Sequence, residues 1–265
     1  MIELKGLKKR FENKEVLKGI DAQFHEGQCN MIIGGSGSGK TVMMKCIVGL
    51  MEPDEGSVLY DGRDFTHLKY GEKRKIRQEL GMLFQYSALF DSMTVEDNVA
   101  FPLRLFTKMS KRKIADRVNF CLDRVNLEKV NNLFPDEISG GMKKRVGIAR
   151  AMALNPKYLF CDEPNSGLDP MTSTVIDKLI KEITIEFKMT TVINTHDMNS
   201  VLEYGDNIIY LYKGTMHWQG TPEEIKASDD EKLKEFIYAS EFIKNQHFSS
   251  DNKKDNTSGR TPQTE

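Results

Sequence analysis

The sequence predicts an α/β fold in which helices cover both faces of a parallel sheet, and three observations support this prediction. Strand-like apolar runs alternate with helix-like segments in the last third of the 265-residue chain. A glycine-rich loop, Gly34–Thr41, connects the apolar run Met31–Ile33 to an apolar-periodic helix that extends to Leu50. A helical stretch at about residues 86–155, bracketed by sheet-forming segments, indicates an inserted lobe with its own hinge.

The first third of the chain is rich in predicted strands. Ile2–Phe11 and Val16–Phe24 alternate apolar and polar side chains, as strands with one buried face do. Ser57–Tyr60 is a further short strand, and the Asp61-Gly62 pair that ends it is a hairpin signal. Ile76–Leu83 closes this β-rich third.

The middle third has the periodicity of helices. Thr94 and Asp97 are spaced as in a capping box, just before an apolar helix over Val95–Leu105. Apolar residues recur at helical spacing within Ser110–Asn126. Ser139–Leu154 is a further predicted helix, and its first turn is basic.

The last third returns to an alternation of strands and helices. The predicted elements are, in order, a strand over Tyr158–Cys161, a helix over Met171–Phe187, strands over Thr191–Asn194 and Ile208–Leu211, a helix capped by Thr221 with Pro222 at its first position and Glu224 at its third, and an amphipathic helix over Asp230–Phe242. From His247 onward the chain is polar and nearly free of apolar residues, so we expect a disordered tail.

The loop Gly34–Thr41 matches the phosphate-binding pattern GxxxxGK[ST]. Its glycines let successive N–H groups face one point, and the following helix adds its positive N-terminus. Lys40 supplies a mobile positive charge for the β- and γ-phosphates, and the Thr41 hydroxyl is a ligand for Mg²⁺. A merely flexible turn would not need Lys-Thr at its end. The pattern therefore predicts a nucleotide site built from Gly34, Gly35, Ser36, Gly37, Ser38, Gly39, Lys40 and Thr41.

Two acids and a second anion site narrow the chemistry. The apolar strand Tyr158–Cys161 delivers Asp162 toward Mg²⁺ and Glu163 toward an attacking water. Upstream, Ser139–Met142 opens a helix and combines a serine hydroxyl, two glycine amides and a helix N-terminus, which together form an anion site. One nucleotide needs only one such cradle. The second therefore indicates the ATP of a partner chain.

These motifs, followed by Ser166–Asp169 and then by His196 after an apolar strand, together resemble the nucleotide-binding subunit of ABC transporters. The resemblance covers about residues 1–243, with every motif in order. The sequence departs from the commonest signature motif, LSGGQ, at Ile138 and Met142, but it keeps the Ser-Gly-Gly core.

The resemblance implies a particular version of the α/β fold. We expect a P-loop NTPase (RecA-like) core of ABC type, with an N-terminal antiparallel β-subdomain. The inserted α-helical subdomain would occupy about residues 86–155. The nucleotide-binding domain as a whole would span residues 1–246, and residues 247–265 would form the polar tail.

The resemblance also implies a role for each matching residue. Glu163 would be the catalytic carboxylate and His196 the switch histidine. Phe11 would stack on adenine, although an aromatic within a strand is more often part of a core. Mg²⁺ would be held by Thr41, Gln85 and Asp162. The residues implied to contact ATP are Phe11, Gly34, Gly35, Ser36, Gly37, Ser38, Gly39, Lys40, Thr41, Gln85, Asp162, Asp169 and, across a dimer, Ser139, Gly140, Gly141 and Met142.

A longer stretch indicates the subfamily. Met82–Leu103 is similar to the ATPases of Mce-type lipid transporters, which include the bacterial phospholipid system that maintains outer-membrane asymmetry. Met142 and the run Asp162–Pro170 fit the same group. Amino-acid importers, methionine importers especially, share part of this stretch. Many of those importers carry a regulatory domain after the ATPase core, for which this chain has no room.

The expected partners follow from the same resemblance. The chain would form a homodimer of ATPase subunits that energises a separate integral membrane permease, with phospholipid as cargo and an Mce-type lipid-binding subunit in the complex. Four apolar residues either line the groove for a permease helix or belong to the core of the helical lobe: Tyr86, Leu89, Phe90 and Phe101.

Composition and charge limit the alternatives. The net charge of −1 does not favour a nucleic-acid partner. The four cysteines form no CxxC pair, which is typical of a reducing cytosolic compartment. No apolar run reaches the roughly 18 residues of a membrane span, so we expect a cytoplasmic protein, peripheral on the inner face of the plasma membrane. A non-transport ABC ATPase would generally need two cassettes or a long coiled coil. Intact Lys40 and Glu163 disfavour an inactive scaffold.

Overall fold

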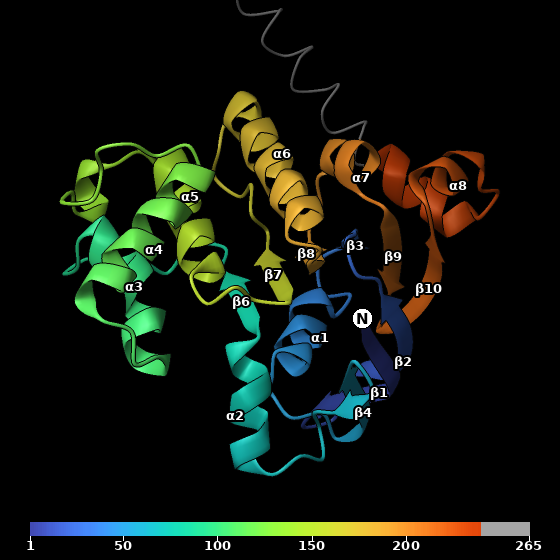
Figure 1. Cartoon of the computed structure of the whole chain (residues 1–265). Helices are drawn as coiled ribbons and strands as arrows, with labels where there is room; N and C mark the ends of the chain where they lie inside the picture. Colours follow the sequence, from blue (N-terminus) through green and yellow to red (C-terminus); the bar gives the residue numbers. More distant parts are fainter. Residues whose placement is uncertain (240–265) are drawn as a thin grey trace, which may run out of the picture.

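The structure, a computed structural model, describes residues 1–239, and a six-stranded sheet lies at its centre (Figure 1). Its strands are β3 (Cys29–Ile33), β6 (Leu80–Leu83), β7 (Tyr158–Asp162), β8 (Thr190–Asn194), β9 (Asn207–Tyr212) and β10 (Thr215–Gly220). Their spatial order is β10-β9-β3-β8-β7-β6, and neighbours are parallel except for β10 and β9. The predicted parallel sheet is confirmed.

The N-terminal part adds a four-stranded antiparallel sheet. Its strands are β1 (Ile2–Phe11), β2 (Lys14–Phe24), β4 (Glu55–Tyr60) and β5 (Arg63–Asp64), in the spatial order β2-β1-β4-β5. Asp61 and Gly62, between β4 and β5, have φ angles of 47° and 77°. Positive φ at both central residues is what a tight two-residue hairpin requires. The antiparallel subdomain and its hairpin are therefore confirmed.

Helices surround the two sheets. They are α1 (Lys40–Ile47), α2 (Tyr70–Gln78), α3 (Val95–Phe106), α4 (Lys111–Arg124), the 3₁₀ helix η1 (Pro135–Glu137), α5 (Gly140–Met152), α6 (Pro170–Glu186), α7 (Met198–Tyr204) and α8 (Pro222–Ala227). Residues 231–239 are helical as well. Thr94 and Thr221 cap α3 and α8 as predicted, because their side chains accept hydrogen bonds from the N–H groups of Asp97 and Glu224.

The boundaries predicted from the sequence need correction. The helix expected to extend to Leu50 ends at Ile47. The β-rich assignment of Ile76–Leu83 is wrong at its start, because Ile76 lies in α2 and the strand begins at Leu80. Ile76 is the one buried residue of α2, so this helix has no apolar periodicity to reveal it. The polar tail at 247–265 and the end of the helix predicted to reach Phe242 lie outside the described residues.

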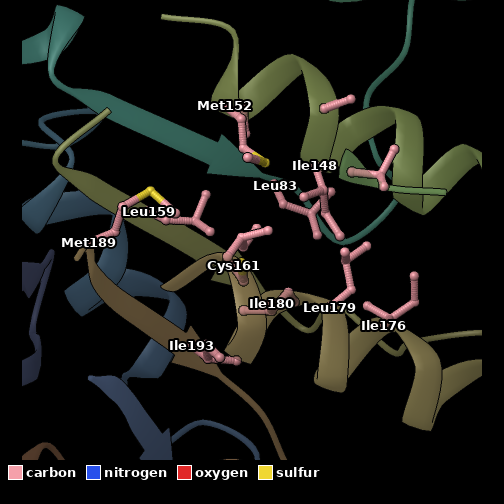
Figure 2. Close-up of a cluster of buried hydrophobic side chains, with 14 of the residues drawn as sticks. Leu83, Ile148, Met152, Leu159, Cys161, Ile176, Leu179, Ile180, Met189 and Ile193 are labelled. Carbon is pink, nitrogen blue, oxygen red and sulfur yellow. The ribbon is translucent and has the colours of Figure 1, made fainter. Parts of the chain in front are cut away.

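Alternating side chains of the central sheet enter two cores. In β7, Tyr158 and Phe160 pack with α1 and the antiparallel sheet, whereas Leu159 and Cys161 face the opposite side. Figure 2 shows side chains of α5 and α6 meeting there over the strands β6 and β7. The central sheet is thus buried on both faces. Polar side chains at the ends of its strands are therefore available to form a functional site.

The inserted helical lobe consists of α3, α4 and α5, in green in Figure 1. Its buried residues Val99 and Val118 belong to the same apolar cluster as Leu159 of the sheet. The lobe and the sheet therefore share one continuous core. A hinge between them stays a prediction.

All four cysteines are free and buried. Burial raises the pKa of the thiols of Cys29, Cys46 and Cys121 to about 11. Within residues 1–239, no helix is long and apolar enough to cross a membrane.

Candidate functional site

The phosphate loop, Gly34–Thr41, lies between β3 and α1, which is the context that its pattern requires. Gly34 has a φ of 150°, and a Cβ there would lie 2.4 Å from the carbonyl oxygen of Leu211. Gly39 has a φ of 108°, and a Cβ there would lie 2.9 Å from the side chain of Leu17. Only glycine fits these two positions, so the sequence fixes the path of the loop.

Two side chains of the loop are poised for an anion. Ser38 Oγ is buried and has no hydrogen-bond partner in the part of the chain that the structure describes. Lys40 Nζ bends back over the loop and donates to the carbonyl oxygen of Gly34 at 2.6 Å. Burial lowers the pKa of Lys40, while the carboxylates of Glu163 and Asp162 oppose this shift. A phosphate group fits here, because it offers an acceptor to Ser38 and a negative charge to Lys40.

The two acids stand at the carboxyl end of β7 beside β8. Asp162 Oδ1 accepts a hydrogen bond from Asn194 Nδ2 at 2.9 Å. The N–H of Glu163 donates to the carbonyl oxygen of Asn194 at 2.9 Å. Glu163 has a φ of 47°, which is uncommon outside glycine and turns its side chain out of the strand direction. Asn194 thus fixes both acids.

Two further predicted residues, Gln85 and His196, lie beside the carboxylate of Glu163. Gln85 Nε2 donates to Glu163 Oε2 at 3.1 Å and to Ser166 Oγ at 3.2 Å. His196 Nδ1 lies 3.5 Å from Glu163 Oε1. Gln85, Glu163 and His196 come from three separate loops, so the fold brings together what the sequence separates.

The remaining predicted residues stand apart from this group. Ser139 caps α5 and its hydroxyl accepts a hydrogen bond from the N–H of Met142 at 3.2 Å, while its own side chain is exposed. Asp169 caps α6, accepting from the N–H of Thr172 at 3.0 Å. Phe11, at the end of β1, is 42% exposed. Their roles toward a nucleotide stay predictions.

Sequence reasoning missed two residues that hold the segment after Gln85. Lys144 Nζ donates to the carbonyl oxygen of Gln85. Arg150 donates to the carbonyl oxygens of Ser87 at 2.6 Å and Ala88 at 2.7 Å. In the sequence these cations look like ordinary polar positions of a basic helix. Asn194 was missed as well. A polar residue at the end of a buried strand could have indicated that Asn194 lies near the site.

Comparison with known proteins agrees with this geometry. The family described as ABC transporter matches residues 17–166. The chain is 39% identical over 236 residues to the probable ribonucleotide transport ATP-binding protein mkl of Mycobacterium leprae, covering 89% of this chain and 68% of that protein. It is also 39% identical over 259 residues to the methionine import ATP-binding protein MetN of Campylobacter jejuni, covering 92% and 77%.

Solved structures match the fold over most of the chain. A dimeric structure of MJ0796, a bacterial ABC transporter cassette, has a TM-score of 0.77 at 35% identity and covers 84% of this chain and 99% of that one. The protein cbiO1 of Clostridium perfringens, part of the ABC transporter complex cbiONQ, has a TM-score of 0.79 at 30% identity, with coverages of 94% and 98%. A further MJ0796 dimer, in a post-hydrolysis state, holds ADP and Pi. The chain therefore belongs to the ABC transporter family, as an ATP-binding subunit that hydrolyses ATP.

Proposed function

We propose that two copies of this chain close around two ATP molecules and energise a separate membrane permease at the cytoplasmic face of the membrane. The observation that carries the proposal is the group formed by Gln85, Glu163 and His196 beside the phosphate loop. The exposed N-terminus of α5 supports the dimer, since its anion site faces outward. Dimeric structures of the related cassette MJ0796 support it too.

Each residue of the group has a distinct task in this proposal. Lys40 and Ser38 hold the phosphates. Glu163 takes a proton from the attacking water, and His196 positions the γ-phosphate. The oxygens of Thr41, Asp162 and Gln85 suit Mg²⁺, a hard cation. When bound, this ion would supply positive charge to the phosphate oxygens.

Apolar side chains beside Gln85 support contact with a permease. Tyr86 is 85% exposed and Phe90 is 41% exposed. Leu89 is half-buried against the core of the helical lobe. The ring of Phe101 packs against Phe90 with centroids 4.9 Å apart. Tyr86 and Phe90 are therefore the available contact residues, and Leu89 and Phe101 mainly support them.

We propose phospholipid as the cargo, on the resemblance of Met82–Leu103 to Mce-type ATPases. An Mce-type lipid-binding subunit would then belong to the complex. Methionine import is the second candidate, because the MetN relative is as similar as the mkl relative, at 39% identity. Length does not separate the two groups. The matched region is 68% of the mkl protein and 77% of MetN, so both relatives extend beyond it.

The test is purification of the complex from its own host. The lipid proposal expects a permease and an Mce-type subunit to copurify, and phospholipid vesicles to stimulate its ATPase. Copurification with an amino-acid permease, or stimulation by methionine and its binding protein, would replace phospholipid with methionine.

The coupling surface has its own test. Tyr86→Asp should dissociate the permease or uncouple hydrolysis from transport, while the isolated subunit keeps its affinity for ATP. Tyr70→Asp is the matched control, because Tyr70 is 77% exposed on α2. A Tyr86→Asp complex that transports normally would refute this contact.

A further inference from the structure

A cavity of about 480 Å³, which Glu163 and His196 help to line, has a buried carboxylate in its wall. The carboxylate is that of Asp177 in the middle of α6, which is only 5% exposed. It accepts hydrogen bonds from Asn165 Nδ2 at 2.7 Å and from Ser200 Oγ at 2.5 Å. Burial raises the pKa of Asp177 to about 6 in spite of these two donors. Keeping the Asp177 carboxylate ionised in the folded protein therefore costs free energy. The stability of the fold alone does not explain why an aspartate occupies this position.

The two donors follow different catalytic residues in the sequence. Asn165 follows Glu163 by two residues, and Ser200 on α7 follows His196 by four. Asn165 Nδ2 also donates to Ser200 Oγ at 3.2 Å, so three side chains close a triangle. Asn165 Oδ1 is buried and has no hydrogen-bond partner among residues 1–239. The side-chain amide of Asn165 is therefore held through its nitrogen, which donates to Asp177 and to Ser200.

Helix α6 connects this triangle to the far end of the Glu163 loop, at Asp169. The helix begins after Asp169, whose carboxylate caps it. In its first turn, Thr172 lies against α5, where a Cβ added to Gly141 would be 2.6 Å from Thr172 Cγ2. Asp177 thus joins two loops, namely the loop between β7 and α6, which contains both Glu163 and Asp169, and the loop of His196.

We propose that Asp177 is a positioning residue for ATP hydrolysis, whose carboxylate keeps the loops of Glu163 and His196 in register. The distance that it maintains is the 3.5 Å between Glu163 Oε1 and His196 Nδ1. This inference rests on the catalytic roles proposed above for those two residues. Loss of the shared acceptor would leave the buried Ser200 hydroxyl without an acceptor and Asn165 with its contact to Ser200 alone, and the loops would separate to find other partners. Small displacements of catalytic groups cost rate more than binding.

The test uses the full-length protein and steady-state kinetics. Asp177→Leu keeps the volume of the side chain and removes the acceptor. Its kcat should fall roughly tenfold to a hundredfold, whereas its KM for ATP should stay nearly unchanged. Asp177→Asn keeps one acceptor oxygen and should retain most of the activity. Thr174→Val is the matched control, because Thr174 lines the same cavity from the same helix and its hydroxyl donates to the carbonyl oxygen of Pro170 in its own helix.

A double variant separates this inference from the proposed function. Because Asp177 acts through Glu163, adding Asp177→Leu to Glu163→Gln should cause little further loss in single-turnover hydrolysis. An unchanged kcat in Asp177→Leu, a rise confined to KM, or full additivity with Glu163→Gln would overturn the inference. If Asp177→Leu does not fold, Ser200→Ala must show the same loss of kcat at constant KM. Wild-type turnover by Glu163→Gln alone would refute the proposed function instead.

Discussion

The two anion cradles of the molecule differ in how complete they are. The first cradle, Gly34–Thr41, is partly buried, contains the unpartnered hydroxyl of Ser38 and has a lysine folded over it. The second cradle, Ser139–Met142, begins with an exposed serine whose hydroxyl is already used to cap its own helix. The second has Met142 at its end, and the two lysines of its helix, Lys143 and Lys144, follow outside it.

This difference supports the proposal that the first cradle binds the phosphates and that the second one senses them. A buried, unpartnered hydroxyl has a strong need for a ligand, so the first cradle can hold phosphate by itself. The second is satisfied without a ligand and offers mainly helix N–H groups, which bind an anion weakly alone. The second cradle would therefore contribute further contacts to an ATP molecule that is already bound by the first cradle of another chain.

The largest expected effect concerns turnover at the first cradle. Glu163→Gln should bind ATP as the wild type does and lose hydrolysis by roughly a hundredfold or more, because it removes the general base. With ATP held and not consumed, the variant should form a stable dimer, measured by light scattering. A protein that stays monomeric at saturating ATP and Mg²⁺, also in the presence of the permease, would contradict the sharing of ATP between cradles.

The second expected effect is on binding itself. Lys40→Ala removes the charge that is proposed to contact the phosphates and should weaken ATP binding by about 3 kcal/mol, roughly a hundredfold in Kd. Titration calorimetry measures this change. Lys45→Ala, in the last turn of α1, is the control and should bind normally. Equal ATP affinity in Lys40→Ala and Glu163→Gln would disprove the division between holding phosphate and activating water.

A mixing experiment tests whether the two cradles of one site come from different chains. Lys40→Ala disables the first cradle, and Ser139→Glu places a negative charge in the second. Neither homodimer should hydrolyse ATP. In a two-fold dimer the mixed species has one intact site, so an equimolar mixture should regain about a quarter of wild-type activity. Ser139→Thr, which keeps a cap, should remain active. No recovery on mixing would mean that both cradles act within one chain.

The next effect concerns the contact between the second cradle's helix and the loop after Gln85. Arg150→Met removes the hydrogen bonds to the carbonyl oxygens of Ser87 and Ala88. We expect the free energy of unfolding in urea to fall by about 2 kcal/mol, with unchanged ATP affinity and lost stimulation by the permease. Arg145→Met, on the same helix, removes one bond to Asn126 and is the milder control. Unimpaired stimulation would show that α5 does not transmit the signal.

The smallest effect is a pH dependence in the cavity that Glu163 and His196 line. Asp177 has a pKa of about 6 in the folded protein, against about 3.9 in an unfolded chain. The folded state therefore binds the proton first as pH falls, and stability rises between pH 7 and 5. Relative to Asp177→Asn, the wild type should gain about 1 kcal/mol of unfolding free energy over this interval. Urea unfolding of both proteins at the two pH values measures it, and parallel curves would contradict the raised pKa.

Much of the fold was predictable because its signals are local. The apolar runs of β7 and β8 are bounded by polar residues, and each of the two helices α3 and α8 has a cap that lies close in the sequence to the N–H group it accepts from. Helix α2 was not predicted, because Ile76 is its one buried residue. Periodicity cannot reveal a helix that lies on the surface with so narrow an apolar face.

The candidate site was predictable to the same extent and for the same reason. Lys40 and Glu163 belong to short patterns, each of which carries its chemistry within a few residues. The contacts of Lys144 and Arg150 join residues 59 to 63 positions apart, and their partners are backbone carbonyl groups that any residue supplies. Asp177 was missed likewise, since its donors Asn165 and Ser200 are ordinary polar residues until the fold assembles them.

The four buried cysteines have a practical consequence for following the dimer in solution. Labelling reagents react with exposed thiolates, and these thiols are both enclosed and, with a raised pKa, protonated at neutral pH. A cysteine introduced at an exposed position such as Tyr86 would then be modified ahead of all four. Fluorophores or spin labels can thus report distances between the two copies as ATP binds, without first replacing any residue of the core.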